Sequence, residues 1–173
     1  LLRMISGLAS PTEGEFTLFG KRRKSAYRYL SRVGTLIEAP GIYPNMSAAD
    51  NLRLKCLAMG VRKKGEIEEL LDIVGLSETG KKKVKNFSMG MKQRLGIALA
   101  LVGDPDLVIL DEPINGLDPQ GIAEVRDTLS RLNRERNLTM IISSHILEEL
   151  SKIATRYGII HDGILLQELT REE

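Results

Sequence analysis

Two neighbouring acidic residues follow an uninterrupted apolar run in this sequence. Asp111 and Glu112 come directly after Leu107–Leu110, a pattern typical of a strand covered on both faces of a sheet. Two carboxylates at a strand end are costly to bury without a cation to pair with them. A magnesium ion on nucleotide phosphates would be such a cation, since one carboxylate binds the ion and its neighbour polarises an attacking water. For this pair taken alone, a surface pair that caps the next helix is an equally good interpretation.

A second apolar run, Thr139–Ser143, ends in the same way, in Ser144 and His145. In a parallel sheet, ligands lie beyond the carboxyl ends of the strands. A neutral imidazole at such an end can donate a hydrogen bond to a phosphate oxygen or a water. A lone histidine is more often structural, but two strands that both end in such groups favour a phosphate site.

The segment Ser88–Lys92 precedes a predicted helix from Lys92 to Val102. The free backbone N–H groups of a helix start bind anions, and the Ser88 hydroxyl and a close backbone approach at Gly90 would add to such a site. The alternative for this motif by itself is simple N-capping of the helix by Ser88.

Strands alternate with helices in the second half of the sequence, which predicts an α/β fold with a parallel sheet. The stretch 44–87 reads as helical and predicts a small lobe. The expected strands are Glu15–Phe19, Val33–Ile37, Leu107–Leu110, Thr139–Ser143 and a hairpin of Tyr157–His161 with Ile164–Gln167. The expected helices are Leu1–Ser6, a helix capped by Ser47 and Asp50 and ending near Met59, Gly65–Val74, Lys92–Val102, Gln120–Arg136, and one marked by Leu147, Leu150 and Ile153.

Length and composition place the chain among globular proteins of one domain. It has 173 residues, 25 Lys and Arg against 23 Asp and Glu, and one cysteine, Cys56, which cannot form an internal disulfide. A net charge of +2 does not argue for nucleic acid. The basic loop Lys81–Lys85 has no aromatic residues between its lysines to stack on bases, so we expect no nucleic-acid partner. No apolar run approaches the roughly 18–20 residues that cross a bilayer.

Four motifs in order resemble those of ABC transporter ATP-binding subunits, and the resemblance covers essentially the whole chain. They correspond to the signature motif, Walker B, the D-loop and the switch histidine, and they are Asn86–Arg94, Leu107–Pro113, Asn115–Pro119 and Ser143–His145. The resemblance implies a P-loop NTPase-like parallel sheet flanked by helices, with residues from about 44 to 87 as a helical subdomain. It also implies ATP and Mg²⁺ as cofactors.

The resemblance gives the residues at the strand ends their expected roles. Asp111 would hold Mg²⁺, Glu112 would be the general base for the hydrolytic water, and His145 would contact the γ-phosphate. This agrees with the chemistry of phosphoryl transfer, which needs positioning and charge neutralisation more than covalent catalysis.

The resemblance also implies a partner copy. Ser88 and Gly90 would bind the γ-phosphate of a nucleotide held by a second ATP-binding subunit, identical or paired. Asp118 would lie at the interface between the two and couple their sites.

Three positions depart from the family pattern. Met89 and Met91 replace the first glycine and the glutamine of the common signature, and Glu38 stands where the family has a glutamine after its strand. A carboxylate at Glu38 can still bind metal or water. Together with Ser88–Met91, the segment Glu38–Pro44 resembles the branch that exports or confers resistance to bacitracin- and lantibiotic-type peptides. Glu38 and its loop would then meet a transmembrane permease subunit.

The phosphate-binding motif Gly-x-x-x-x-Gly-Lys-Ser/Thr is absent from the sequence, and the resemblance places it immediately before Leu1. We therefore expect a partial ABC ATP-binding domain over 1–173, whose parent protein is an ATPase on the cytoplasmic face of the cell membrane. The chain by itself is expected to bind ATP poorly. The alternatives are a soluble ABC-type ATPase acting on ribosomes and a non-catalytic docking module.

Overall fold

The central element is a parallel sheet of three strands in the order β3-β4-β5. In the computed structural model, which describes residues 1–22, 27–136 and 138–171, these strands are β3 (Val33–Leu36), β4 (Leu107–Asp111) and β5 (Thr139–Ser143). Leu36 lies opposite Leu110, and Asp111 lies opposite Ser143. All three strands therefore end at the same edge of the sheet, as the α/β prediction requires.

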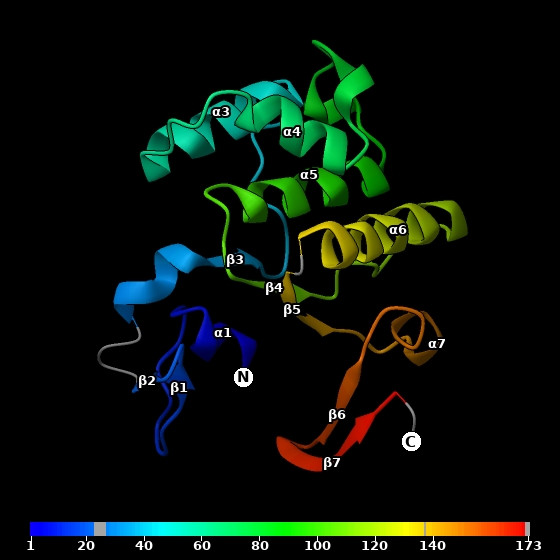
Figure 1. Cartoon of the computed structure of the whole chain (residues 1–173). Coiled ribbons are helices and arrows are strands. Elements are labelled where there is room, and N and C mark those ends of the chain that lie inside the picture. The colour runs from blue at the N-terminus through cyan, green and yellow to red at the C-terminus, as the bar shows by residue number, and fades with distance from the viewer. Residues whose placement is uncertain (23–26, 137, 172–173) are drawn as a thin grey trace.

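The helices of the middle of the chain, with the long helix that follows β4, stand on one side of this sheet (Figure 1). They are α3 (Ala48–Met59), α4 (Glu66–Ile73), α5 (Met89–Leu101) and α6 (Pro119–Arg136). In Figure 1, α5 lies between the sheet and the pair α3–α4, and α6 runs beside α5. One hydrophobic core joins these layers; its fully buried members include Leu52, Leu70, Leu95, Leu110 and Leu129. The helices of the expected 44–87 lobe thus share their core with the sheet.

The ends of these helices are fixed by local sequence. The Ser47 hydroxyl accepts a hydrogen bond from the Asp50 N–H at 3.1 Å, and Gly60 ends α3 in the left-handed conformation. The predicted cap is confirmed. The helix expected from Lys92 begins earlier, at Met89, because Ser88 already caps it through the Met91 N–H at 3.2 Å.

Strand β3 approaches α5 so closely that no side chain fits between them at Gly34. A Cβ atom on Gly34 would lie 1.9 Å from the backbone oxygen of Ala100. A helix at this distance covers one face of β3 and β4, where Leu36, Val108 and Leu110 are buried in the core shared with the helices.

The other face of the sheet is covered by the N-terminal segment. Here α1 (Leu2–Ile5), β1 (Thr17–Leu18), β2 (Lys21–Arg22) and the 3-10 helix η1 (Tyr27–Arg32) surround a second apolar cluster on Leu107 and Ile109. The expected strand Glu15–Phe19 is only two residues long, because Phe19 and Gly20 turn the chain with positive φ. Gly7, with a φ of 77°, follows α1 in the left-handed conformation that is common after a helix end.

The C-terminal part contains α7 (Leu147–Leu150) and the hairpin of β6 (Arg156–His161) and β7 (Ile164–Thr170). Asp162 and Gly163 both have positive φ, so the predicted hairpin turn is confirmed. Helix α7 is shorter than the expected Leu147–Ile153. Two short 3-10 helices, η2 (Ser77–Thr79) and η3 (Val84–Asn86), connect α4 to α5. In the part of the chain that the structure describes, no helix has the length and apolar character of a membrane span.

Candidate functional site

The carboxyl ends of β4 and β5 are joined by one hydroxyl group. Ser143 is the last residue of β5, and its Oγ donates to Asp111 Oδ1 at 2.6 Å. The same Oγ accepts a hydrogen bond from the Glu112 backbone N–H at 2.9 Å. Ser143 therefore orients the Asp111 carboxylate and anchors the backbone of the residue that follows it.

Glu112 adopts a backbone conformation that is rare for a residue with a side chain. Its φ is 49°, in the left-handed region, where a Cβ atom is strained. This conformation aims the carboxylate at His145, whose Nδ1 lies 2.9 Å from Glu112 Oε2. With a proton on Nδ1, the imidazole donates to Glu112. Nε2 is then an acceptor in the neutral ring and a donor in the doubly protonated ring. The imidazole side chain is 63% exposed.

The structure therefore brings together the three groups that the sequence placed at the strand ends. Asp111 and Glu112 are bridged by Ser143, and Glu112 contacts His145 directly. The donor set consists of carboxylate and hydroxyl oxygens, which suits Mg²⁺. Across 1–22, 27–136 and 138–171, no three His, Cys, Asp or Glu side chains cluster as metal ligands by themselves. An ion at Asp111 would thus need oxygen ligands from phosphates or water.

Glu38 lies beyond the end of β3, at the same edge of the sheet. It too has a positive φ, of 65°, and its carboxylate forms an ion pair with Arg3 at 3.3 Å. Its side chain is 66% exposed. Metal binding by Glu38 remains a prediction, and it would compete with this ion pair.

The starts of α5 and α6 form a second part of the candidate site. Ser88 is exposed and caps α5, as the alternative interpretation expected. Gly90 is buried, and a Cβ atom there would lie 3.4 Å from the Cα of Gly121 on α6. Asp118 caps α6 by accepting from the Gly121 N–H at 3.1 Å. The contacts of Ser88, Gly90 and Asp118 thus set the geometry of two adjoining helix starts, and their roles toward nucleotide remain predictions.

Ser143 was not among the candidate residues taken from the sequence. A serine at the end of a strand is unremarkable until the register of the sheet is known, because only the pairing of β4 with β5 places it opposite Asp111. In the sequence, the only signal for a role of Ser143 is its position at the end of the apolar run that precedes His145.

The fold and the paired carboxylates at the sheet edge define a P-loop NTPase-like α/β domain. The family model described as ABC transporter matches residues 1–115. The chain belongs to the ABC transporter family.

Relatives with known roles include antibiotic transport proteins. The chain is 49% identical over 169 residues to the bacitracin transport ATP-binding protein BcrA of Bacillus licheniformis; the match covers 97% of this chain and 55% of that protein. It is 43% identical over 168 residues to the lantibiotic transport ATP-binding protein SrtF of Streptococcus pyogenes, with 97% and 72% covered. The chain thus spans about half the length of the bacitracin relative.

Solved structures show the same fold. An ATP-binding cassette in a dimeric post-hydrolysis state, bound to ADP and Pi, superposes with a TM-score of 0.83 at 23% identity, over 98% of this chain and 78% of that chain. The protein cbiO1 of Clostridium perfringens, part of the cbiONQ transporter complex, superposes with a TM-score of 0.84 at 23% identity, over 98% and 71%.

Proposed function

We propose that this chain is part of an ATP-binding subunit that powers a membrane transporter of bacitracin- or lantibiotic-type peptides. The observation that carries the proposal is the joined group of Asp111, Ser143, Glu112 and His145 at the carboxyl edge of a parallel sheet. The named relatives supply the transported class, since both are transport ATP-binding proteins for peptide antibiotics.

In this function each residue has one task. Asp111 would hold Mg²⁺, which neutralises charge on the phosphates of ATP. Glu112 would accept a proton from the attacking water, and its strained, anchored backbone keeps the carboxylate in one position. His145 would donate from Nε2–H to a γ-phosphate oxygen when both of its ring nitrogens carry a proton, while Nδ1–H donates to Glu112 and fixes the imidazole ring.

The start of α5 supports a paired arrangement of two ATP-binding subunits. Ser88 is exposed at a helix N-terminus, where backbone N–H groups favour anions, although its hydroxyl already accepts the capping bond. We propose that Ser88 and the Gly90 backbone face the γ-phosphate of the partner subunit's nucleotide, and that Asp118 lies between the two subunits.

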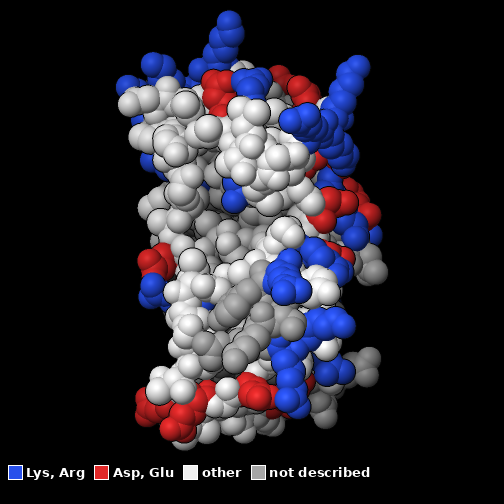
Figure 2. Space-filling view, turned by 90° about the vertical axis from the view of Figure 1, so that its left-hand side faces the viewer, with Lys and Arg blue, Asp and Glu red and all other residues white. Residues whose placement is uncertain are grey.

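A groove beside Glu38 supports docking of a permease. It has a volume of about 350 Å³ and lies between α3, α5 and the segment that follows β3. Its lining includes Ile37, Pro40, Tyr43, Leu54 and Leu99. On the face drawn in Figure 2 the surface is hollowed at mid-height and carries few charged side chains there. We propose that a transmembrane subunit contacts this groove, which would place the protein on the cytoplasmic face of the membrane.

The test uses the full-length protein with its membrane subunits in vesicles. Glu112→Gln is expected to lower the ATP turnover number at least about a hundredfold, because the general base is lost, while ATP still binds. Glu148→Gln is the matched control, since its side chain is 86% exposed on α7, and it is expected to keep normal turnover. Unchanged turnover in Glu112→Gln, or purification with ribosomes instead of membrane subunits, would overturn the proposal.

A further inference from the structure

The guanidinium group of Arg94, a residue of α5, forms hydrogen bonds with the C-terminal end of α4 and with α6. Its Nη1 donates to the backbone oxygens of Val74 at 2.8 Å and Gly75 at 2.9 Å, just beyond α4. Its Nη2 donates to Glu124 Oε2 on α6 at 2.9 Å. The side chain is only 12% exposed, and within the described residues its buried Nε has no hydrogen-bond partner.

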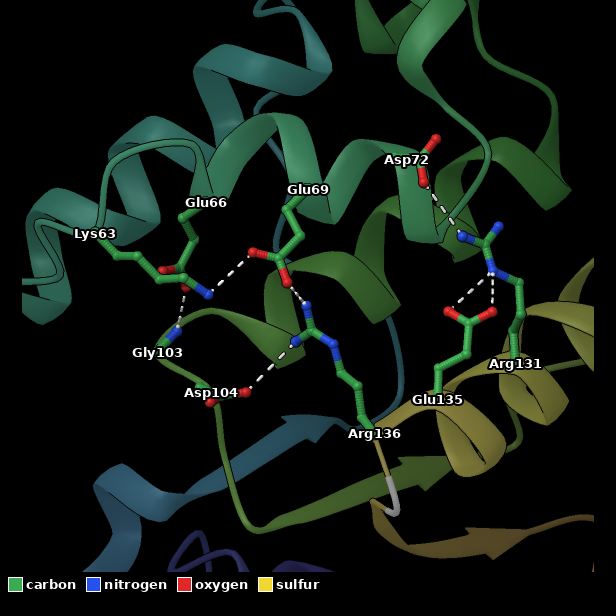
Figure 3. A network of polar contacts seen from close by, with 9 residues as sticks. All are labelled: Lys63, Glu66, Glu69, Asp72, Gly103, Asp104, Arg131, Glu135 and Arg136. Carbon is green, nitrogen blue, oxygen red and sulfur yellow. Dashed lines mark hydrogen bonds and ion pairs between the residues drawn. The ribbon is translucent and has the colours of Figure 1, made fainter.

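Two further ion pairs join α4 to α6, and they are drawn in Figure 3. Glu69 pairs with Arg136, and Asp72 pairs with Arg131 at 3.2 Å. Residue numbers rise along α4 while they fall along α6, so the two helices run antiparallel. The Arg94 contacts, from Gly75 to Glu124, continue this series toward the N-terminal end of α6.

The Arg94 contacts differ in kind from the two outer pairs. Asp72 and Glu69 are exposed, and solvent and salt screen such pairs. Arg94 is mostly buried and satisfies carbonyl groups that a helix end leaves without partners. A glycine at position 75 leaves room for the guanidinium group. Gly75 has a φ of 63°, and a Cβ atom there would lie 3.0 Å from Arg94 Nη1.

Arg94 and its partner Glu124 lie close to the second part of the candidate site, the starts of α5 and α6. Gly90 is four residues before Arg94 on α5, and Gly121 is three residues before Glu124 on α6, so each is about one helical turn away. These two glycines approach each other closely between the starts of α5 and α6. The Arg94 contacts therefore lie about one helical turn from both helix starts.

We propose that Arg94 is a positioning residue that couples the C-terminal end of α4 to the starts of α5 and α6. A displacement of α3 and α4 reaches Ser88 and Asp118 through its guanidinium group. The effect on ATP turnover rests on the proposed function, whereas the mechanical coupling does not.

The coupling is tested by amide hydrogen exchange in the full-length protein. Arg94→Met is expected to speed exchange by at least about tenfold in two separate segments, 74–76 and 88–92. Arg131→Met, which removes an outer ion pair, is the matched control and leaves exchange in 88–92 at the wild-type rate. Wild-type exchange in 88–92 of Arg94→Met, or the same increase in the control, would overturn the proposal.

Turnover provides the second readout. Arg94→Met is expected to lower kcat at least about tenfold while the KM for ATP stays within about twofold, because the helix starts lose their alignment. Arg94→Lys keeps the charge but cannot reach all three acceptors, so it should recover only part of kcat. If Arg94→Met does not fold, Arg94→Lys and Glu124→Gln carry both measurements, and wild-type values for both variants contradict the coupling. A wild-type protein without ATP turnover would refute the proposed function and leave the exchange result decisive.

Discussion

The Ser143 hydroxyl lies 2.6 Å from Asp111 Oδ1, across the register of two parallel strands. Through its second contact, with the Glu112 N–H, it also holds a residue whose backbone is strained. One hydroxyl group thus orients the Asp111 carboxylate and anchors the backbone of Glu112 at the end of β4. The site is organised by the pairing of β4 with β5 and by a serine that contacts both Asp111 and the backbone of Glu112.

Replacing Ser143 by alanine should therefore damage both stability and function. Loss of the hydroxyl leaves the Glu112 N–H and Asp111 without this partner, so we expect a cost of about 1–3 kcal/mol in the free energy of unfolding. The ATP turnover of the full-length protein should fall as well, because Glu112 is no longer anchored.

Ser144→Ala is the matched control for this change. Ser144 Oγ accepts from the Ile146 N–H at 3.0 Å, and among the described residues it forms no hydrogen bond with Asp111 or Glu112. Chemical denaturation gives the free energies of unfolding, and a phosphate-release assay gives turnover. Equal turnover in the two variants would refute the anchoring role of Ser143.

Gly34→Ala should disrupt the layer of α5 on β3. The new Cβ atom would lie 1.9 Å from a backbone oxygen, which no side-chain rotation can relieve, so we expect a loss of at least about 3 kcal/mol or failure to fold. Gly41→Ala serves as the control, because no atom lies within 4 Å of its added Cβ. Thermal unfolding of both variants checks this, and a Tm for Gly34→Ala close to that of Gly41→Ala would contradict the close approach.

The ion pair between Glu69 and Arg136 should weaken in acid. The hydrogen bond from Lys63 holds the pKa of Glu69 below its ordinary value of 4.5, and Arg136 lowers this pKa further. The folded protein thus favours the charged carboxylate, and its contribution to stability is present above about pH 4.5 and is lost as the pH falls through the lowered pKa.

Glu69→Gln removes this titration and should lose less Tm than the wild type between about pH 6 and pH 3. Glu78→Gln changes an exposed carboxylate that has no ion pair among the described residues, and it should follow the wild-type curve. The same acid-induced drop of Tm in all three proteins would show that the Glu69 contacts contribute nothing.

Much of the local structure follows from the sequence because its causes are local. Ser47 and Asp50 mark the start of α3, and the apolar run before Asp111 marks a strand buried on both faces. The hairpin turn at Asp162 and Gly163 is likewise fixed by the residues themselves. One local pattern gave a wrong length: the alternation over Glu15–Phe19 predicts a longer strand than β1, which has two residues.

The sequence by itself determined that Asp111, Glu112 and His145 follow strand ends, which a parallel sheet must bring to one edge, and it predicts that these residues carry the chemistry. Only the tertiary structure decided what holds these groups in place. Ser143 meets Asp111 through the strand register, Glu38 meets Arg3, and Arg94 meets Val74, Gly75 and Glu124. These partners lie 20 or more residues apart in most cases, and no local preference of the chain selects them. The packing of helices and strands around a common core does so.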